Sequence, residues 1–160
     1  MDPSEGMLNI GRTKVEQAGF HADVVRLLHG DAQALNPTLP EGMLFDAATM
    51  AFAIRNVPNR LLALAELASR LRPGGRLAVL ELGAPTFAPA RWFVRYAVPV
   101  LGSLISGGSW REYRHLERSV LAFNAEEFAD LIRKVGLDIH SVETMNFGSV
   151  GLYVARKPLR

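Results

Sequence analysis

The sequence predicts a single α/β domain, residues 1–160, built on a partly parallel sheet, and two observations predict it. Residues 45–82 have the pattern of a strand, a helix and a second strand. The first strand, an apolar run from Asp46 to Ala53, has the length of a strand buried on both faces, as central parallel strands are. Near the end of the chain, two strand patterns flank a short turn and predict an antiparallel hairpin. With 160 residues, 49% of them hydrophobic, the chain can bury one such core.

The central unit also indicates where a ligand would bind. Its helix, residues 59–71, is expected to turn one apolar face to the sheet and to leave Asn59, Glu66 and Arg70 in solvent. That apolar face comprises Leu61, Leu64, Ala65, Ala68 and Leu71. Pro73-Gly74-Gly75 ends the helix, and residues 77–82 form the second strand, apolar except for Glu81. Because such sheets bind ligands at the carboxyl ends of their strands, residues 51–56 and Glu81 are the first candidates.

The segment before this unit is predicted to be a helix, a short strand and a loop. The helix covers residues 4–18, with Asp2 or Ser4 as its cap and Gly19 ending it in a left-handed turn. Residues 24–28 have the pattern of a short buried strand, and residues 30–42, rich in proline and glycine, form the loop to the central unit.

The segment after it contains an insertion. Residues 83–121 lack a strand pattern; instead, residues 91–105, interrupted by a proline, and residues 110–121 are predicted to be helical. This insertion is expected on the ligand side of the sheet. The main pattern resumes with a helix capped by Asn124 and ending at Gly136, followed by hairpin strands over residues 139–145 and 150–155.

Composition excludes several function classes. The formal charge is +2, and its 18 basic residues form no block, which argues against a nucleic-acid partner. The absence of cysteine excludes disulfides and thiolate metal sites, and the histidines lack metal-ligand spacing, so no metal site is predicted. The first residues have no apolar core of a secretory signal, so the cytoplasm is the default location.

Several separated motifs resemble the ubiquinone/menaquinone biosynthesis C-methyltransferase family. The motifs are FDAATMAFAIRNVPN, LRPGGRLAVLELGAP, the YRHL segment at residues 113–116 with Ser119-Val120, the closing GSV with RKP, and the opening DPSEGML with Gly11-Arg12. The resemblance covers nearly the whole chain. It implies a Rossmann-like class I methyltransferase fold with a C-terminal antiparallel hairpin. Three positions depart from the family pattern: Ala53, His115 and Arg118.

The resemblance also implies what is missing. The family's first strand and glycine-rich loop should lie upstream of Asp2, and no GxGxG spacing occurs in the chain. Either the chain is a fragment or it is a shortened paralogue. A lone copy should have a gap in its sheet with unpaired backbone groups, so we expect strand exchange in a homo-oligomer, rearrangement or marginal stability.

By resemblance, S-adenosylmethionine is the cofactor, and five residues are expected to bind it. Asp2 would accept hydrogen bonds from the ribose hydroxyls, or it is only a helix cap. Asp31 and Ala32 would meet the adenine, although a solvated turn is the alternative for Asp31. Ala51 and Phe52 would border the cofactor at the strand end, although Phe52 also suits a plain core position.

The acceptor implied by the resemblance is a prenylated hydroquinone, methylated on carbon. Arg55 would stabilise a developing phenolate and Asn56 would orient a ring oxygen; a salt bridge at a helix start is the alternative for Arg55. Tyr113 and Arg114 would cover the acceptor, and His115 has the chemistry to take a hydroxyl proton, with a surface histidine as the alternative.

Two further alternatives stay open on sequence alone. The aromatic and arginine-bearing segment over residues 91–96 fits either a lid helix or peripheral contact with the inner membrane surface and a polyprenyl tail. The chain as a whole fits either the enzyme or a non-catalytic methyltransferase remnant that acts as a binding or scaffold subunit. A nucleotide-binding oxidoreductase has only the alternating pattern in its favour.

Overall fold

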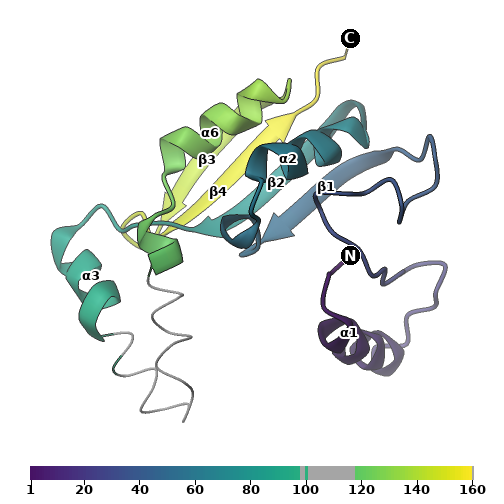
Figure 1. Cartoon of the computed structure of the whole chain (residues 1–160), viewed down its shortest axis with the longest axis horizontal. Helices are drawn as coiled ribbons and strands as arrows, with labels where there is room; N and C mark the ends of the chain where they lie inside the picture. The colour runs from purple at the N-terminus through teal and green to yellow at the C-terminus, as the bar shows by residue number, and fades with distance from the viewer. Residues whose placement is uncertain (98–99, 101–117, 160) are drawn as a thin grey trace.

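In the computed structural model, which describes residues 1–97, 100 and 118–159, four strands form one mixed sheet (Figure 1). They are β1 (Phe45–Ala51), β2 (Leu71–Leu82), β3 (Asp138–Met145) and β4 (Val150–Arg156), in the order β1-β2-β4-β3. β1 and β2 are parallel, and β4 is antiparallel to both of its neighbours. The predicted crossover unit and the predicted hairpin are therefore confirmed, and β4 joins them by pairing with β2.

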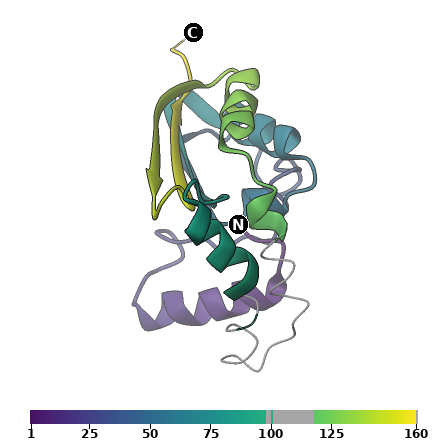
Figure 2. The same cartoon turned by 90° about the vertical axis from the view of Figure 1, so that its left-hand side faces the viewer.

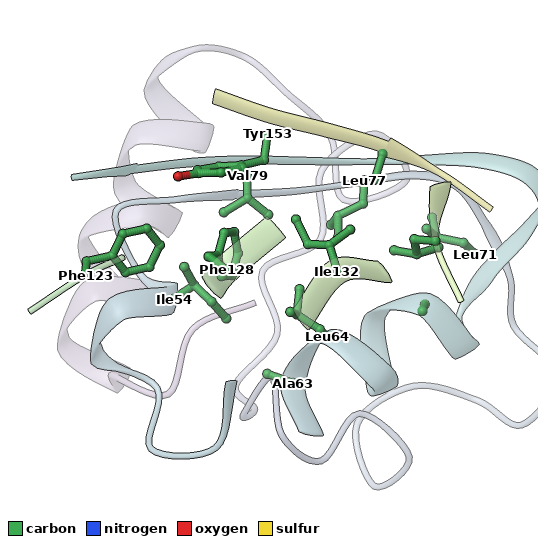
Figure 3. Close-up of a cluster of buried hydrophobic side chains, with 13 residues drawn as sticks. Ile54, Ala63, Leu64, Leu71, Leu77, Val79, Phe123, Phe128, Ile132 and Tyr153 are labelled. Carbon is green, nitrogen blue, oxygen red and sulfur yellow. The ribbon is translucent and has the colours of Figure 1, made fainter. Parts of the chain in front are cut away.

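Two helices, α2 (Arg60–Ser69) and α6 (Ala125–Lys134), cover one face of this sheet (Figure 2). Asn59 and Asn124 begin them by accepting hydrogen bonds from backbone amides of the first turns, as side-chain oxygens do at helix starts. Figure 3 shows the core between helices and sheet. It comprises Ile54, Ala63, Leu64, Ala68, Leu71, Leu77, Val79, Phe123, Phe128, Ile132, Leu137, Tyr153 and Ala155.

The predicted inner face of α2 is partly wrong. Leu64 and Ala68 are buried as expected, but Leu61 is 42% exposed and Ala65 is exposed, whereas Ala63 is fully buried. The helix sequence RLLALAELAS is apolar on nearly all sides, so its period allows more than one inner face. Packing against the sheet and α6 selects the one that contains Ala63.

The prediction that the first strand is buried on both faces is also wrong. Ala48 and Met50 pack against the core, but Ala47, Thr49 and Ala51 on the opposite face are exposed. Within the described residues, β1 lies at the edge of the sheet, and β2 is the one strand that pairs with it. The expected gap with unpaired backbone groups corresponds to this open edge.

The Pro-Gly-Gly segment lies inside the second strand and does not end the helix, because α2 already ends at Ser69 and β2 begins at Leu71. β2 begins at Leu71, opposite Phe45, and the register then jumps so that Ala47 pairs with Arg76. The intervening turn has Gly74 at φ +79° and bonds to the C-terminal strand, with the Gly74 amide donating to the Lys157 carbonyl at 2.9 Å. A glycine is needed at Gly75 too, because an added Cβ would lie 2.9 Å from the Arg72 carbonyl oxygen.

At the N-terminus the helix is confirmed and the strand is not. α1 (Glu5–Gln17) is capped by Ser4, whose hydroxyl accepts from the Met7 amide, and Gly19 follows at φ +72°. Residues 24–28 form no strand, and Val24 is exposed. The N-terminal segment instead makes isolated bridges, between Asp2 and His29 and between Asp31 and Ala34.

Arg70 is buried rather than solvent-facing. Its guanidinium donates to the carbonyl oxygens of Pro40 and Met43 and, at 2.6 Å, to the Asn36 side chain. The backbone carbonyl of Arg70 accepts from the Phe45 amide at 2.8 Å. This single side chain therefore attaches the predicted loop before β1 to the end of α2.

The region after β2 begins with α3 (Ala88–Trp92) and one π-helical turn, η2 (Phe93–Ala97). The remainder of the predicted insertion, apart from residue 100 and a helical stretch at 118–121, lies outside the described residues. Among the helices of the described part, none is long and apolar enough to cross a membrane.

Candidate functional site

The carboxyl ends of β1 and β2 lie side by side and form the candidate site. β1 ends at Ala51, and the Phe52 amide still donates to the Leu80 carbonyl of β2 at 2.8 Å. Phe52 then adopts φ +55°, which is rare for a bulky residue. A short 3₁₀ helix, η1 (Ile54–Asn56), follows, and its first residue, Ile54, is fully buried in the core.

A buried ion pair fixes this turn. The Glu81 carboxylate, near the end of β2, is 0% exposed and accepts a 2.6 Å hydrogen bond from Nη1 of Arg55, whose side chain is 10% exposed. The backbone amides of Arg55 and Leu82 also donate to this carboxylate, at 3.0 and 2.8 Å. Arg55 therefore has the salt-bridge geometry that was the alternative to substrate contact.

The same guanidinium also holds the strained residue. Nη1 of Arg55 donates to the Phe52 carbonyl at 2.7 Å, whereas the buried Nε has no hydrogen-bond partner. Asn56 is exposed, and Phe52 is 44% exposed, so Phe52 is not a core residue. Within the turn, Phe52 and Asn56 are the side chains that a ligand at the strand ends can reach.

Asp2 and Asp31 are brought onto adjacent segments by backbone pairing. Asp2 bridges to His29, and the Gly30 amide donates to the Asp2 carbonyl at 3.2 Å. Oδ1 of Asp2 accepts from the Ser4 amide, and Oδ1 of Asp31 accepts from the Gln33 amide. Each carboxylate is thus part of a local turn, and Oδ2 of Asp31 also accepts from Nε2 of Gln33 at 3.2 Å.

The Asp31 turn is tied to the central unit by side-chain hydrogen bonds. The Asn59 amide, at the start of α2, donates to Gln33 Oε1 at 2.9 Å, and the Leu35 amide donates to Glu66 at 2.9 Å. Ala32 packs against the core. These contacts hold the Asp31–Ala32 segment against the start of α2, the helix that follows the Phe52–Asn56 turn.

The remaining predicted acceptor residues are not described by the structure. Tyr113, Arg114 and His115 lie outside the described residues. Before them, α3 and η2 carry exposed rings of Trp92 and Tyr96, whose centroids are 5.6 Å apart. Two surface hollows of about 460 Å³ each lie elsewhere, beside β3 and between α2 and α6, and no residue assigned to the site lines either.

Glu81 is named from the sequence as a candidate for the ligand site, but without a chemical role. Its signal is a single acid within an otherwise apolar strand, LAVLELG. A carboxylate is rarely buried without a partner, so a charge in such a run indicates a buried pair. The sequence alone does not identify Arg55, 26 positions away, as that partner.

The comparisons with known proteins agree with this fold. The model of the ubiE/COQ5 methyltransferase family matches residues 1–157. The demethylmenaquinone methyltransferase of Bacillus cereus (strain AH187) is 34% identical over 163 residues, covering 99% of this chain. The alignment spans 66% of that relative, so the chain corresponds to just under two thirds of its length.

Solved structures share the fold. The [4+2]-cyclase SpnF superposes with a TM-score of 0.71 at 16% identity, covering 99% of this chain and 64% of its own. A SAM-dependent methyltransferase from Aquifex aeolicus gives 0.63 at 18% identity, covering 96% and 65%. The predicted Rossmann-like class I fold is therefore confirmed. Since the family model covers nearly the whole sequence, the chain belongs to the ubiE/COQ5 methyltransferase family.

Proposed function

We propose that this chain acts in S-adenosylmethionine-dependent C-methylation of a prenylated hydroquinone in menaquinone or ubiquinone biosynthesis. The observation that carries the proposal is the family match over residues 1–157, which includes the Arg55-Asn56 turn at the strand ends. The relatives named demethylmenaquinone methyltransferase support the acceptor class.

We assign binding of S-adenosylmethionine to five residues, most of which would contact its adenosine portion. Asp2 would bind the ribose hydroxyls, Asp31 and Ala32 the adenine, and Ala51 and Phe52 would border the bound molecule. The exposed ring of Phe52 supports its assignment. When bound, S-adenosylmethionine supplies an electrophilic methyl group on a sulfonium.

The chain's own residues would hold the acceptor. Loss of a hydroxyl proton raises the electron density on the adjacent ring carbon, and Asn56 would orient a ring oxygen. Arg55, whose guanidinium pairs with Glu81, would support the turn that presents Asn56. We assign Tyr113 and His115 to the acceptor side as well, with residues 83–121 as the insertion that covers it and excludes water.

Two partners belong to the proposal. The exposed rings on α3 and η2, together with Arg91 and Arg95, suit contact with a membrane surface from which a polyprenyl tail would enter. The open edge of β1 suits pairing with a strand of another copy in a homo-oligomer. The competing function is a non-catalytic remnant that binds or scaffolds.

Calorimetric titration of S-adenosylhomocysteine into the purified chain, with the mass in solution measured alongside, tests the proposal. We expect micromolar binding and a mass above that of the 17.6 kDa monomer. Asp31→Asn, which keeps the size of the side chain, should weaken binding about tenfold because a charge-assisted hydrogen bond is lost. If the folded chain showed no binding heat, the proposal that it is an enzyme by itself would be contradicted. The non-catalytic remnant would then be the remaining function.

A further inference from the structure

We infer that Glu81 is a positioning residue: its buried carboxylate holds Arg55, and through Arg55 the strained turn that presents Phe52 and Asn56 at the strand ends. The inference rests on the proposed function for what those two side chains meet. The conformation of the turn is independent of it.

The hydrogen bonds of Glu81 converge on this turn. Oε1 accepts from Arg55 Nη1 and from the Leu82 amide, and Oε2 accepts from the Arg55 amide. All three donors are N–H groups, and the carboxylate is fully buried. Both the backbone and the side chain of Arg55 are therefore tied to the end of β2.

The backbone strain at Phe52 depends on the hydrogen bonds of Arg55 and Glu81. A non-glycine residue at φ +55° persists only where its surroundings over-determine it. Nη1 of Arg55 donates to the Phe52 carbonyl as well as to Glu81, and Nη2 of Arg60 donates to the Arg55 carbonyl at 3.1 Å. One nitrogen thus links the carboxylate to the strained peptide.

Stability alone does not account for a carboxylate at this position. A well-packed apolar pair in place of a buried ion pair is often neutral or stabilising, because the charges need no desolvation. What an apolar pair lacks is the set of directional hydrogen bonds to the Arg55 amide and the Phe52 carbonyl. The contribution of Glu81 is therefore the geometry of the turn.

Nuclear magnetic resonance of the unliganded full chain tests this geometry directly. In Glu81→Gln, amide hydrogen exchange at Arg55 and Leu82 should accelerate at least about tenfold, and φ-sensitive couplings should show Phe52 leaving its left-handed conformation. Asp46→Asn is the matched control, because Asp46 and Arg72 also join β1 to β2 at 2.6 Å but are exposed. It should leave both amides and Phe52 unchanged.

A second variant covers a failure of Glu81→Gln to fold. Arg55→Met combined with Glu81→Leu replaces both charges by apolar groups and should fold, yet Phe52 should again lose its positive φ. If Phe52 kept its left-handed conformation in either folded variant, the inference would be overturned. Glu81 would then be a buried charge that does not determine the conformation of the turn. Absence of S-adenosylhomocysteine binding by the unmutated chain would refute the proposed function and leave this result unaffected.

Discussion

Tyr153 illustrates how a single residue links the core to the site. Its side chain is buried, and burial raises the pKa of its phenol, which the nearby Glu81 charge raises further. In the unfolded chain the phenol should ionise near pH 10, while in the folded chain it keeps its proton to higher pH. The folded state then binds more protons than the unfolded one, so the free energy of unfolding should fall as pH rises above about 10.

Tyr153→Phe should reduce this alkaline loss, because no phenol then ionises at that position. Urea unfolding of both proteins at about pH 8 and about pH 11 measures it. If the unmutated chain and Tyr153→Phe lost equal stability between these pH values, ionisation of Tyr153 would not be the cause of the alkaline loss.

At the scale of the elements, two substitutions in α2 test which face of this helix packs on the sheet. Leu64→Ala should lower the free energy of unfolding by about 2–5 kcal/mol, because a fully buried side chain leaves a cavity. Leu61→Ala, one turn earlier on the same helix, should lower it by about 1 kcal/mol or less, since 42% of the surface of Leu61 is already in solvent. Urea unfolding measures both variants. If the two lost similar free energies of unfolding, Leu61 would belong to the inner face after all.

The start of α6 depends on Asn124. Its side-chain oxygen accepts from the amides of Glu126 and Glu127 at 3.0 and 3.2 Å. Asn124→Ala should lower the free energy of unfolding by about 1 kcal/mol, because both amides lose their acceptor. Asn124→Asp retains an oxygen acceptor and should stay close to the unmutated chain; thermal unfolding of the three proteins compares them.

At the scale of the whole molecule, Arg70 connects the N-terminal segment to the sheet. Arg70→Met should keep the apolar stem but leave the carbonyls of Pro40 and Met43 without this donor, at a cost of about 2 kcal/mol. We expect faster chymotryptic cleavage within residues 35–44. Arg72→Met is the control, because the side chain of Arg72 is exposed and donates to the exposed Asp46. Equal cleavage of both variants would show that Arg70 does not hold the segment in place.

Local patterns were sufficient for the elements whose signals lie within a few residues. Asn124 caps its helix as predicted, and Ser4, one of the two predicted caps, begins α1. The turn at residues 146–149 closes the predicted hairpin. The family resemblance rested likewise on contiguous motifs and is confirmed. Chain chemistry over short distances, namely capping hydrogen bonds and hydrophobic period, carries this information.

Contacts between distant segments required the folded molecule. The inner face of α2, the burial of Arg70 and the pairing of Arg55 with Glu81 each depend on groups about 26 or more positions apart. Residues 24–28 have strand composition yet form no strand, because a strand is stable only when a neighbour pairs with it. Local sequence specifies what a segment can become, and packing decides which buried polar groups meet, since each must find a partner once water is excluded.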